Sequence, residues 1–206
     1  MNYNFSKLGL SRNEINDLET VSNIKSILSL IFLYLSTILI IFISIFIFKS
    51  DQYYYLTPFF LILIASRIGA FLNLMHEASH NVLFTNIKYN NLIAKWLLGC
   101  PIGINFSDYT KRHLHHHAHT TTSKEPESDK DKYEEVNVKS LNFLKFCLYD
   151  IIGYSAFKVF FSIGEKNVKK PNKIKTIKNL INIIIIQFLI LLIFKFDLLL
   201  YFIFWI

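Results

Sequence analysis

Seven histidines, gathered in two short stretches, are the residues of this sequence best suited to chemistry. The first histidine cluster, residues 76–80, reads HEASH and contributes two of them. The second histidine cluster, residues 113–119, reads HLHHHAH and contributes the other five. Imidazole is a good ligand for iron, zinc and copper. Because histidine occurs nowhere else in the chain, the two clusters indicate a metal site rather than packing.

Helical spacing separates the expected metal ligands from the remaining histidines. Residues 76 and 80 are four apart and therefore share one face of a helix. Residues 113, 116 and 117 fall within an arc of about 100° on a second helix. His115 and His119 lie on the opposite side and are expected to be solvated or to hydrogen-bond the ligands. The five expected ligands are His76, His80, His113, His116 and His117.

The elements that position these histidines are predicted to be membrane helices. Hydrophobic residues make up 52% of the 206 residues and occur in long blocks. Residues 26–48 carry no charge and are long enough to span a bilayer as a helix. A second apolar run, residues 53–75, starts with interfacial tyrosines and ends at the first histidine cluster. Arg67 lies inside this run, where a charge must face protein or a water-filled interior, so it indicates either a functional role or, as we expect, helix packing.

The later apolar segments predict further helices. Residues 92–104 are too short to span and are expected to form an interfacial helix, as are residues 141–163. Residues 180–194 and 198–206 predict a helical hairpin that turns at residues 195–197, with a second arm shorter than a span. The predicted fold is therefore an all-α polytopic membrane protein with two transmembrane hairpins, the second incomplete. We expect one domain, residues 1–206, that is truncated at its C-terminus.

The positive charge indicates a membrane surface rather than nucleic acid. The net charge is +7, but the basic residues cluster between apolar blocks. Most of the lysines and arginines lie in residues 81–179. The positive-inside rule then places the N-terminus and both histidine clusters on the cytoplasmic side.

One alternative is a membrane zinc metalloprotease. The first cluster fits HExxH, in which two histidines bind zinc and the glutamate, here Glu77, is the general base. This interpretation needs a third ligand and leaves the second cluster largely unexplained. A site with several metal ions and histidine ligands explains both clusters.

With these motifs, the sequence resembles the membrane fatty acid desaturase family, which also includes carotenoid ketolases and related hydroxylases. That family has an HxxxH box at the cytoplasmic end of a transmembrane helix, matched here by His76 and His80. An HxxHH box follows, matched by His113, His116 and His117. The surrounding stretches HEASHNVLFTN and YTKRHLHHHAHT match as well. The resemblance is closest over residues 55–130.

The resemblance implies a di-iron centre that uses O2 to remove hydrogens from an acyl chain, with electrons from ferredoxin or cytochrome b5. Glu77 and Asn73 would lie near the ligands and support them. The family also has a third histidine box, whereas no histidine follows His119 here. The sequence therefore leaves open whether the chain alone is an active enzyme. Alternatives are a carotenoid ketolase or hydroxylase, the zinc protease, and a remnant without catalytic activity.

Overall fold

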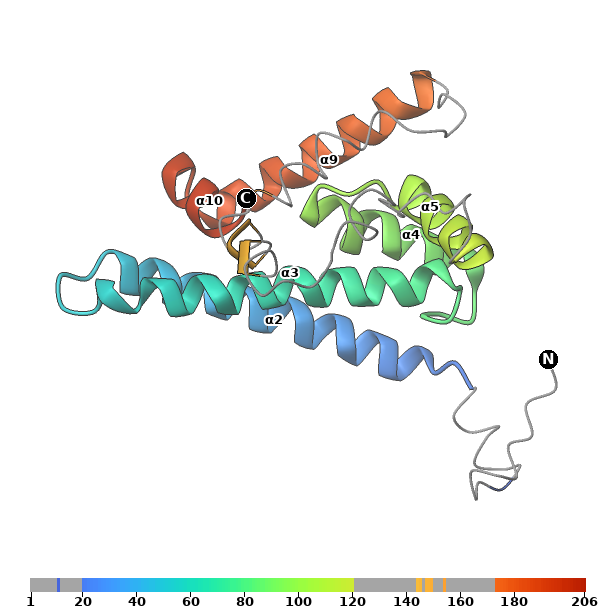
Figure 1. The fold of residues 1–206 in the computed structure, drawn as a ribbon, viewed down its shortest axis with the longest axis horizontal. Helices are drawn as coiled ribbons and strands as arrows, with labels where there is room; N and C mark the ends of the chain where they lie inside the picture. Colours follow the sequence, from blue (N-terminus) through green and yellow to red (C-terminus); the bar gives the residue numbers. More distant parts are fainter. Residues whose placement is uncertain (1–10, 12–19, 121–143, 146, 150–153, 155–172) are drawn as a thin grey trace. The chain divides into compact units, whose positions relative to one another are not determined.

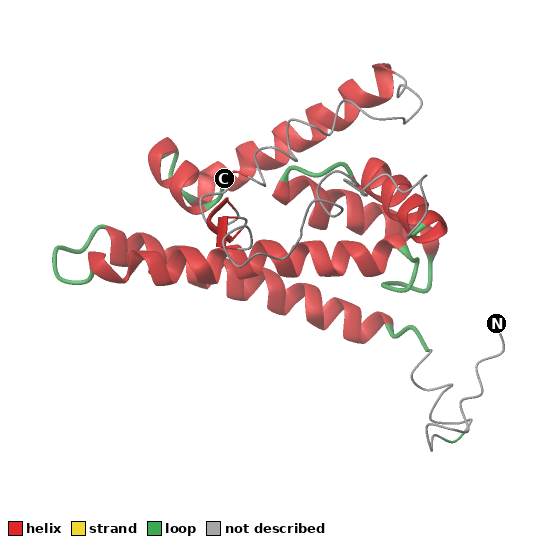
Figure 2. Ribbon diagram, viewed as in Figure 1, coloured by secondary structure: helices red, strands yellow, loops and turns green. Residues whose placement is uncertain are grey.

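The structure of the protein is a computed structural model, which describes residues 11, 20–120, 144–145, 147–149, 154 and 173–206 (Figure 1). All regular structure in these residues is helical, which confirms the predicted all-α class (Figure 2). The described residues fall into two compact units, divided between Thr110 and Lys111 and again between Ile177 and Lys178. The predicted charged loop at 123–135 and most of the predicted interfacial helix at 141–163 lie outside the described residues.

Two long helices of the first unit are long and apolar enough to cross a membrane. They are α2, Asn23–Phe48, and α3, Thr57–Ser79, the latter extended at its start by the 3-10 helix η2, Tyr54–Leu56. The two helices lie side by side (Figure 1). Ser22 caps α2 by accepting a hydrogen bond from the backbone N–H of Lys25, as polar N-cap residues commonly do. The two predicted spans are thus confirmed as apolar helices of sufficient length.

Polar side chains inside this helix pair are satisfied locally or by the partner helix. The hydroxyl of Thr37 donates to the carbonyl of Leu33, one turn earlier, at 2.6 Å. Arg67 Nη1 reaches the hydroxyl of Ser36 on α2 at 3.5 Å, so this charge contributes to packing between α2 and α3 as expected. Such pairing reduces the cost of polar groups in an apolar environment.

The segment expected as one interfacial helix at 92–104 is instead broken into three pieces. They are α4, Ile87–Ile93, the π-helix η3, Ala94–Gly99, and the 3-10 helix η4, Cys100–Ile102. Ala94, Leu98 and Gly99 are buried, and η3 packs against α3. Pro101 lacks an N–H and therefore cannot continue a regular helix. The burial of one face makes this segment part of the core.

The last two helices meet at a sharp bend. They are α9, Lys173–Ile193, and α10, Leu198–Phe204. The turn between them lies where the sequence predicted it, and Lys195 and Phe196 there have positive φ angles of 53° and 61°. The helix axes bend by 107°, which is less than the near reversal of a hairpin. The bend allows α10 to bury Leu200, Tyr201 and Phe204, and Asp197 at the turn pairs with Lys49 at 3.8 Å.

The core of the first unit reaches the first histidine cluster. Phe71 is 1% exposed and makes edge-to-face contacts with Tyr34 on one side and Trp205 on the other. Further along α3, Met75 and Ala78 are completely buried. These two residues flank His76 in the sequence. The apolar face of α3 therefore fixes the rotation of the helix that carries the cluster.

Candidate metal centre

The first histidine cluster occupies the last turn of α3 and its C-cap. His76 lies in the last turn, and His80 is the C-cap residue. Asn81 follows with φ of 61°, and its N–H bonds to the carbonyl of Ala78 at 3.0 Å. The N–H of Val82 bonds to the carbonyl of Glu77 at 3.2 Å. This pair of bonds is a Schellman motif, so the helix ends immediately after His80 through a defined backbone geometry.

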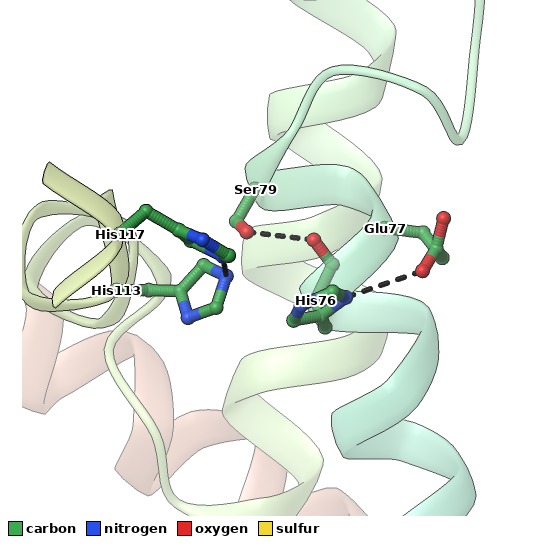
Figure 3. A network of polar contacts seen from close by, with 5 residues as sticks. All are labelled: His76, Glu77, Ser79, His113 and His117. Carbon is green, nitrogen blue, oxygen red and sulfur yellow. Dashed lines mark hydrogen bonds and ion pairs between the residues drawn. The ribbon is translucent and has the colours of Figure 1, made fainter. Parts of the chain in front are cut away.

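The two imidazoles of the first cluster lie against each other. Their ring centroids are 4.8 Å apart, as expected for residues one turn apart. Nδ1 of His76 contacts Oε1 of Glu77 at 3.2 Å, and the hydroxyl of Ser79 donates to the carbonyl of His76 (Figure 3). A carboxylate on Nδ1 fixes the ring and leaves Nε2 available, which is how metal-binding histidines are commonly oriented. Glu77 therefore contacts and supports His76, and the side chains of both Glu77 and Asn73 are exposed.

The second histidine cluster lies on α5, Phe106–His119. Asn105 precedes this helix and accepts a hydrogen bond from the N–H of Ser107 at 3.1 Å. Its amide also donates to the carboxylate of Asp108 at 2.7 Å. An asparagine cap followed by an acidic residue in the first turn favours helix formation at this point. The buried side chain of Phe106 holds the same turn in the core of the first unit.

Within the second unit, His113 and His117 face each other. Their Nε2 atoms are 3.0 Å apart (Figure 3). A metal–imidazole bond is about 2.1 Å long, as for zinc, so two nitrogens bound at right angles to one ion lie about 3 Å apart. The pair therefore has a spacing that suits one shared metal ion, and without an ion it is compatible with an N–H···N hydrogen bond.

The remaining histidines of α5 are arranged differently. The ring of His116 is half-buried, and its centroid lies 6.4 Å from that of His113. His115 and His119 contact each other edge to face, with ring centroids 4.3 Å apart. Within each unit the structure thus brings one pair of expected ligands together, His76 with His80 and His113 with His117. His116 lies further from His113 than His117 does.

Comparison with known proteins identifies the family. The family model described as "Fatty acid desaturase" matches residues 52–206, about three quarters of the chain. The chain belongs to the fatty acid desaturase family. This match includes α3, both histidine clusters and the α9–α10 pair. No curated protein and no solved structure matches the chain significantly. Members of this desaturase family are di-iron enzymes, and the histidine pair in each unit of this chain is compatible with metal binding.

The sequence did not reveal the asparagines that hold the backbone around the first cluster. Asn86 caps α4 by accepting from the N–H groups of Lys88 and Tyr89. Asn23 on α2 bonds to Thr85, and the buried side chain of Asn90 bonds to the backbone of Ala78 and Phe84. Because asparagine is frequent throughout this chain, its presence at these positions did not distinguish them in the sequence. The start of α4 at Asn86 was the one signal available, because asparagine is a common N-cap.

Proposed function

We propose that this protein is a lipid desaturase-like membrane oxidoreductase that binds iron through the histidines of its two clusters. The proposal is carried by two close histidine pairs, one at the end of α3 and one on α5, in a chain of the fatty acid desaturase family. When bound, a di-iron centre would supply the oxidising power needed to remove hydrogens from unactivated methylenes with O2. The proposed ligands are His76, His80, His113, His116 and His117.

The residues of the chain would contribute position and orientation. The apolar helices α2 and α3 are suited to an acyl substrate dissolved in the membrane, because many of their large side chains are exposed. The first cluster ends α3, so metal bound there would lie at the end of an apolar helix, within reach of a lipid chain. Because the methylenes of an acyl chain are alike in reactivity, the carbon that is held beside the oxidant is the one that reacts.

The proposed orientation places the N-terminus and both clusters on the cytoplasmic side, with α9 and α10 as a second membrane-inserted pair. The support is the concentration of lysine and arginine in residues 81–179. A cytoplasmic metal centre would be accessible to a ferredoxin or to a cytochrome b5-type electron donor, which we propose as the partner. Because this chain supplies two of the three histidine boxes of the family, we propose that it requires further ligands for turnover.

Metal binding by the purified protein tests the ligand assignment. The protein is purified in detergent, supplied with Fe(II) under anaerobic conditions, and analysed for iron per chain. The double variant His113→Ala/His117→Ala is expected to lose most of the bound iron. The matched control His115→Ala/His119→Ala removes two histidines of the same helix with the same spacing and is expected to retain it.

Two results would overturn the proposal. One is a wild-type protein that binds no iron, or that binds zinc in its place and cleaves peptides in a Glu77-dependent manner. The other is equal iron loss in both double variants, which would indicate binding to any exposed histidine. The lipid and carotenoid profiles of a host that expresses the chain then distinguish an acyl substrate from a carotenoid.

A further inference from the structure

Asn90 is a buried polar side chain whose hydrogen bonds reach the first histidine cluster. It lies on the short helix α4, is 0% exposed, and is the buried residue of that helix. Burying a side-chain amide costs free energy unless its donors and acceptor are satisfied. The hydrogen bonds of the buried Asn90 side chain are therefore needed to offset the cost of its burial.

Both ends of the Asn90 amide bond to backbone groups, one in the last turn of α3 and one in the loop that follows it. Nδ2 donates to the carbonyl of Ala78 at 2.8 Å, and Oδ1 accepts from the N–H of Phe84 at 3.2 Å. Ala78 is the central residue of the first cluster, two positions from each histidine. Its carbonyl also accepts from the N–H of Asn81, the residue that ends α3. The amide thus joins the last turn of α3 to the loop that follows.

Other ties hold this loop further from the histidines. The side chain of Asn23 bonds to Thr85, and the hydroxyl of Ser26 donates to the carbonyl of Leu83. These contacts attach residues 83–85 to α2. Asn90 differs because its Nδ2 reaches the backbone of the cluster itself. A change at Asn90 would therefore act on the direction in which the last turn of α3 presents its imidazoles.

We propose that Asn90 is a positioning residue for the metal centre, which holds the end of α3 so that His76 and His80 face the metal together. This inference rests on the proposed iron site. Supporting interactions around metal ligands typically contribute a factor of about 10–100 in metal affinity. The contribution of Asn90 would pass through the backbone of Ala78 and not through contact with the metal.

The test compares two amide-to-acid substitutions in the same unit. Asn90→Asp preserves the acceptor for Phe84 and removes the donor to Ala78. Gln187→Glu is its match, because Nε2 of Gln187 donates to the carbonyls of Cys100 and Pro101 while Oε1 accepts from Tyr201. Co(II), a probe whose visible spectrum reports its ligand geometry, is titrated into each variant against a chelator. Thermal unfolding of the metal-free proteins measures the stability lost in each.

Asn90→Asp is expected to weaken Co(II) binding about 10- to 100-fold and to alter the spectrum. Gln187→Glu is expected to lose stability but to keep the wild-type affinity for Co(II) and the wild-type Co(II) spectrum. Wild-type affinity in folded Asn90→Asp, or equal weakening in both variants, would overturn the role of Asn90 alone. If Asn90→Asp does not fold, Asn90→Ser takes its place and must show the same weakening of Co(II) binding relative to Gln187→Glu. Failure of the wild-type protein to bind Co(II) would instead refute the proposed metal site.

Discussion

Gly99 lies at the closest backbone approach in the broken segment, and replacing it by alanine should destabilise the protein. A Cβ atom at this position would lie 2.5 Å from the carbonyl oxygen of Ile104 and 3.5 Å from Sδ of Met75. The Ile104 oxygen belongs to the backbone and cannot rotate away. The N–H of Ile104 also bonds to the carbonyl of Gly99 at 2.8 Å, which holds the two ends of this turn together. Gly99→Ala therefore forces the backbone to shift.

The expected size follows from the geometry. Inserting a methyl group into a packed site typically costs about 1–3 kcal/mol, and the clash with a backbone atom places Gly99→Ala in the upper half of that range. For a chain of about 200 residues, each kcal/mol lowers the midpoint of thermal unfolding by roughly 2–4 °C. The variant should thus melt roughly 4–12 °C below the wild-type protein.

Gly69 provides a control within the same unit. It lies inside α3, and a Cβ atom there would meet nothing within 4 Å. Alanine is preferred over glycine in a helix by about 1 kcal/mol, so Gly69→Ala should raise the melting midpoint by roughly 2–4 °C. Circular dichroism of the detergent-purified proteins measures both shifts. The reasoning fails if Gly99→Ala melts at or above the wild-type midpoint, or if Gly69→Ala falls as far as Gly99→Ala.

Two further predictions concern the histidine clusters. Asn81→Gly should keep the wild-type melting midpoint, whereas Asn81→Val should lower stability by about 1–2 kcal/mol, because valine is strained at φ of 61°; equal midpoints for the two variants would contradict the Schellman geometry. His116→Ala should lower the iron content of the purified protein while His115→Ala does not. Unchanged iron in His116→Ala would reduce the proposed ligand set to His76, His80, His113 and His117.

The long apolar helices and the pairing of histidines could be predicted because both depend on local periodicity. Residues 26–48 are uncharged over the length of a bilayer, so α2 follows from composition alone. Likewise, His76 and His80 are neighbours on any helix that contains both. The sequence also indicated the turn at Lys195, since polar residues interrupt an apolar run there. Each of these inferences needs only the residues within one element.

The broken segment and the bend of α10 could not be predicted because they depend on distant partners. The π-helix η3 is stabilised where it packs on α3, and the hydroxyl of Tyr34 on α2 donates to the carbonyl of Leu97 at 2.6 Å. The carbonyl of Pro101 accepts from Gln187 and from the indole of Trp205, more than 80 positions later. Without these donors, backbone groups freed by the irregular helices would be buried unsatisfied.

The direction of each histidine pair in the proposed metal centre depends on the backbone at the end of the helix that carries it. A regular helix sets the spacing within a pair, such as the 3.0 Å between His113 Nε2 and His117 Nε2. It does not set the direction in which the pair points, because that depends on where the helix starts or ends. The end of α3 is determined by Asn81 and Asn90, and the start of α5 by Asn105. We therefore infer that the spacing of the proposed ligands is encoded in the histidines, and that their direction depends on the asparagines at the ends of the two helices.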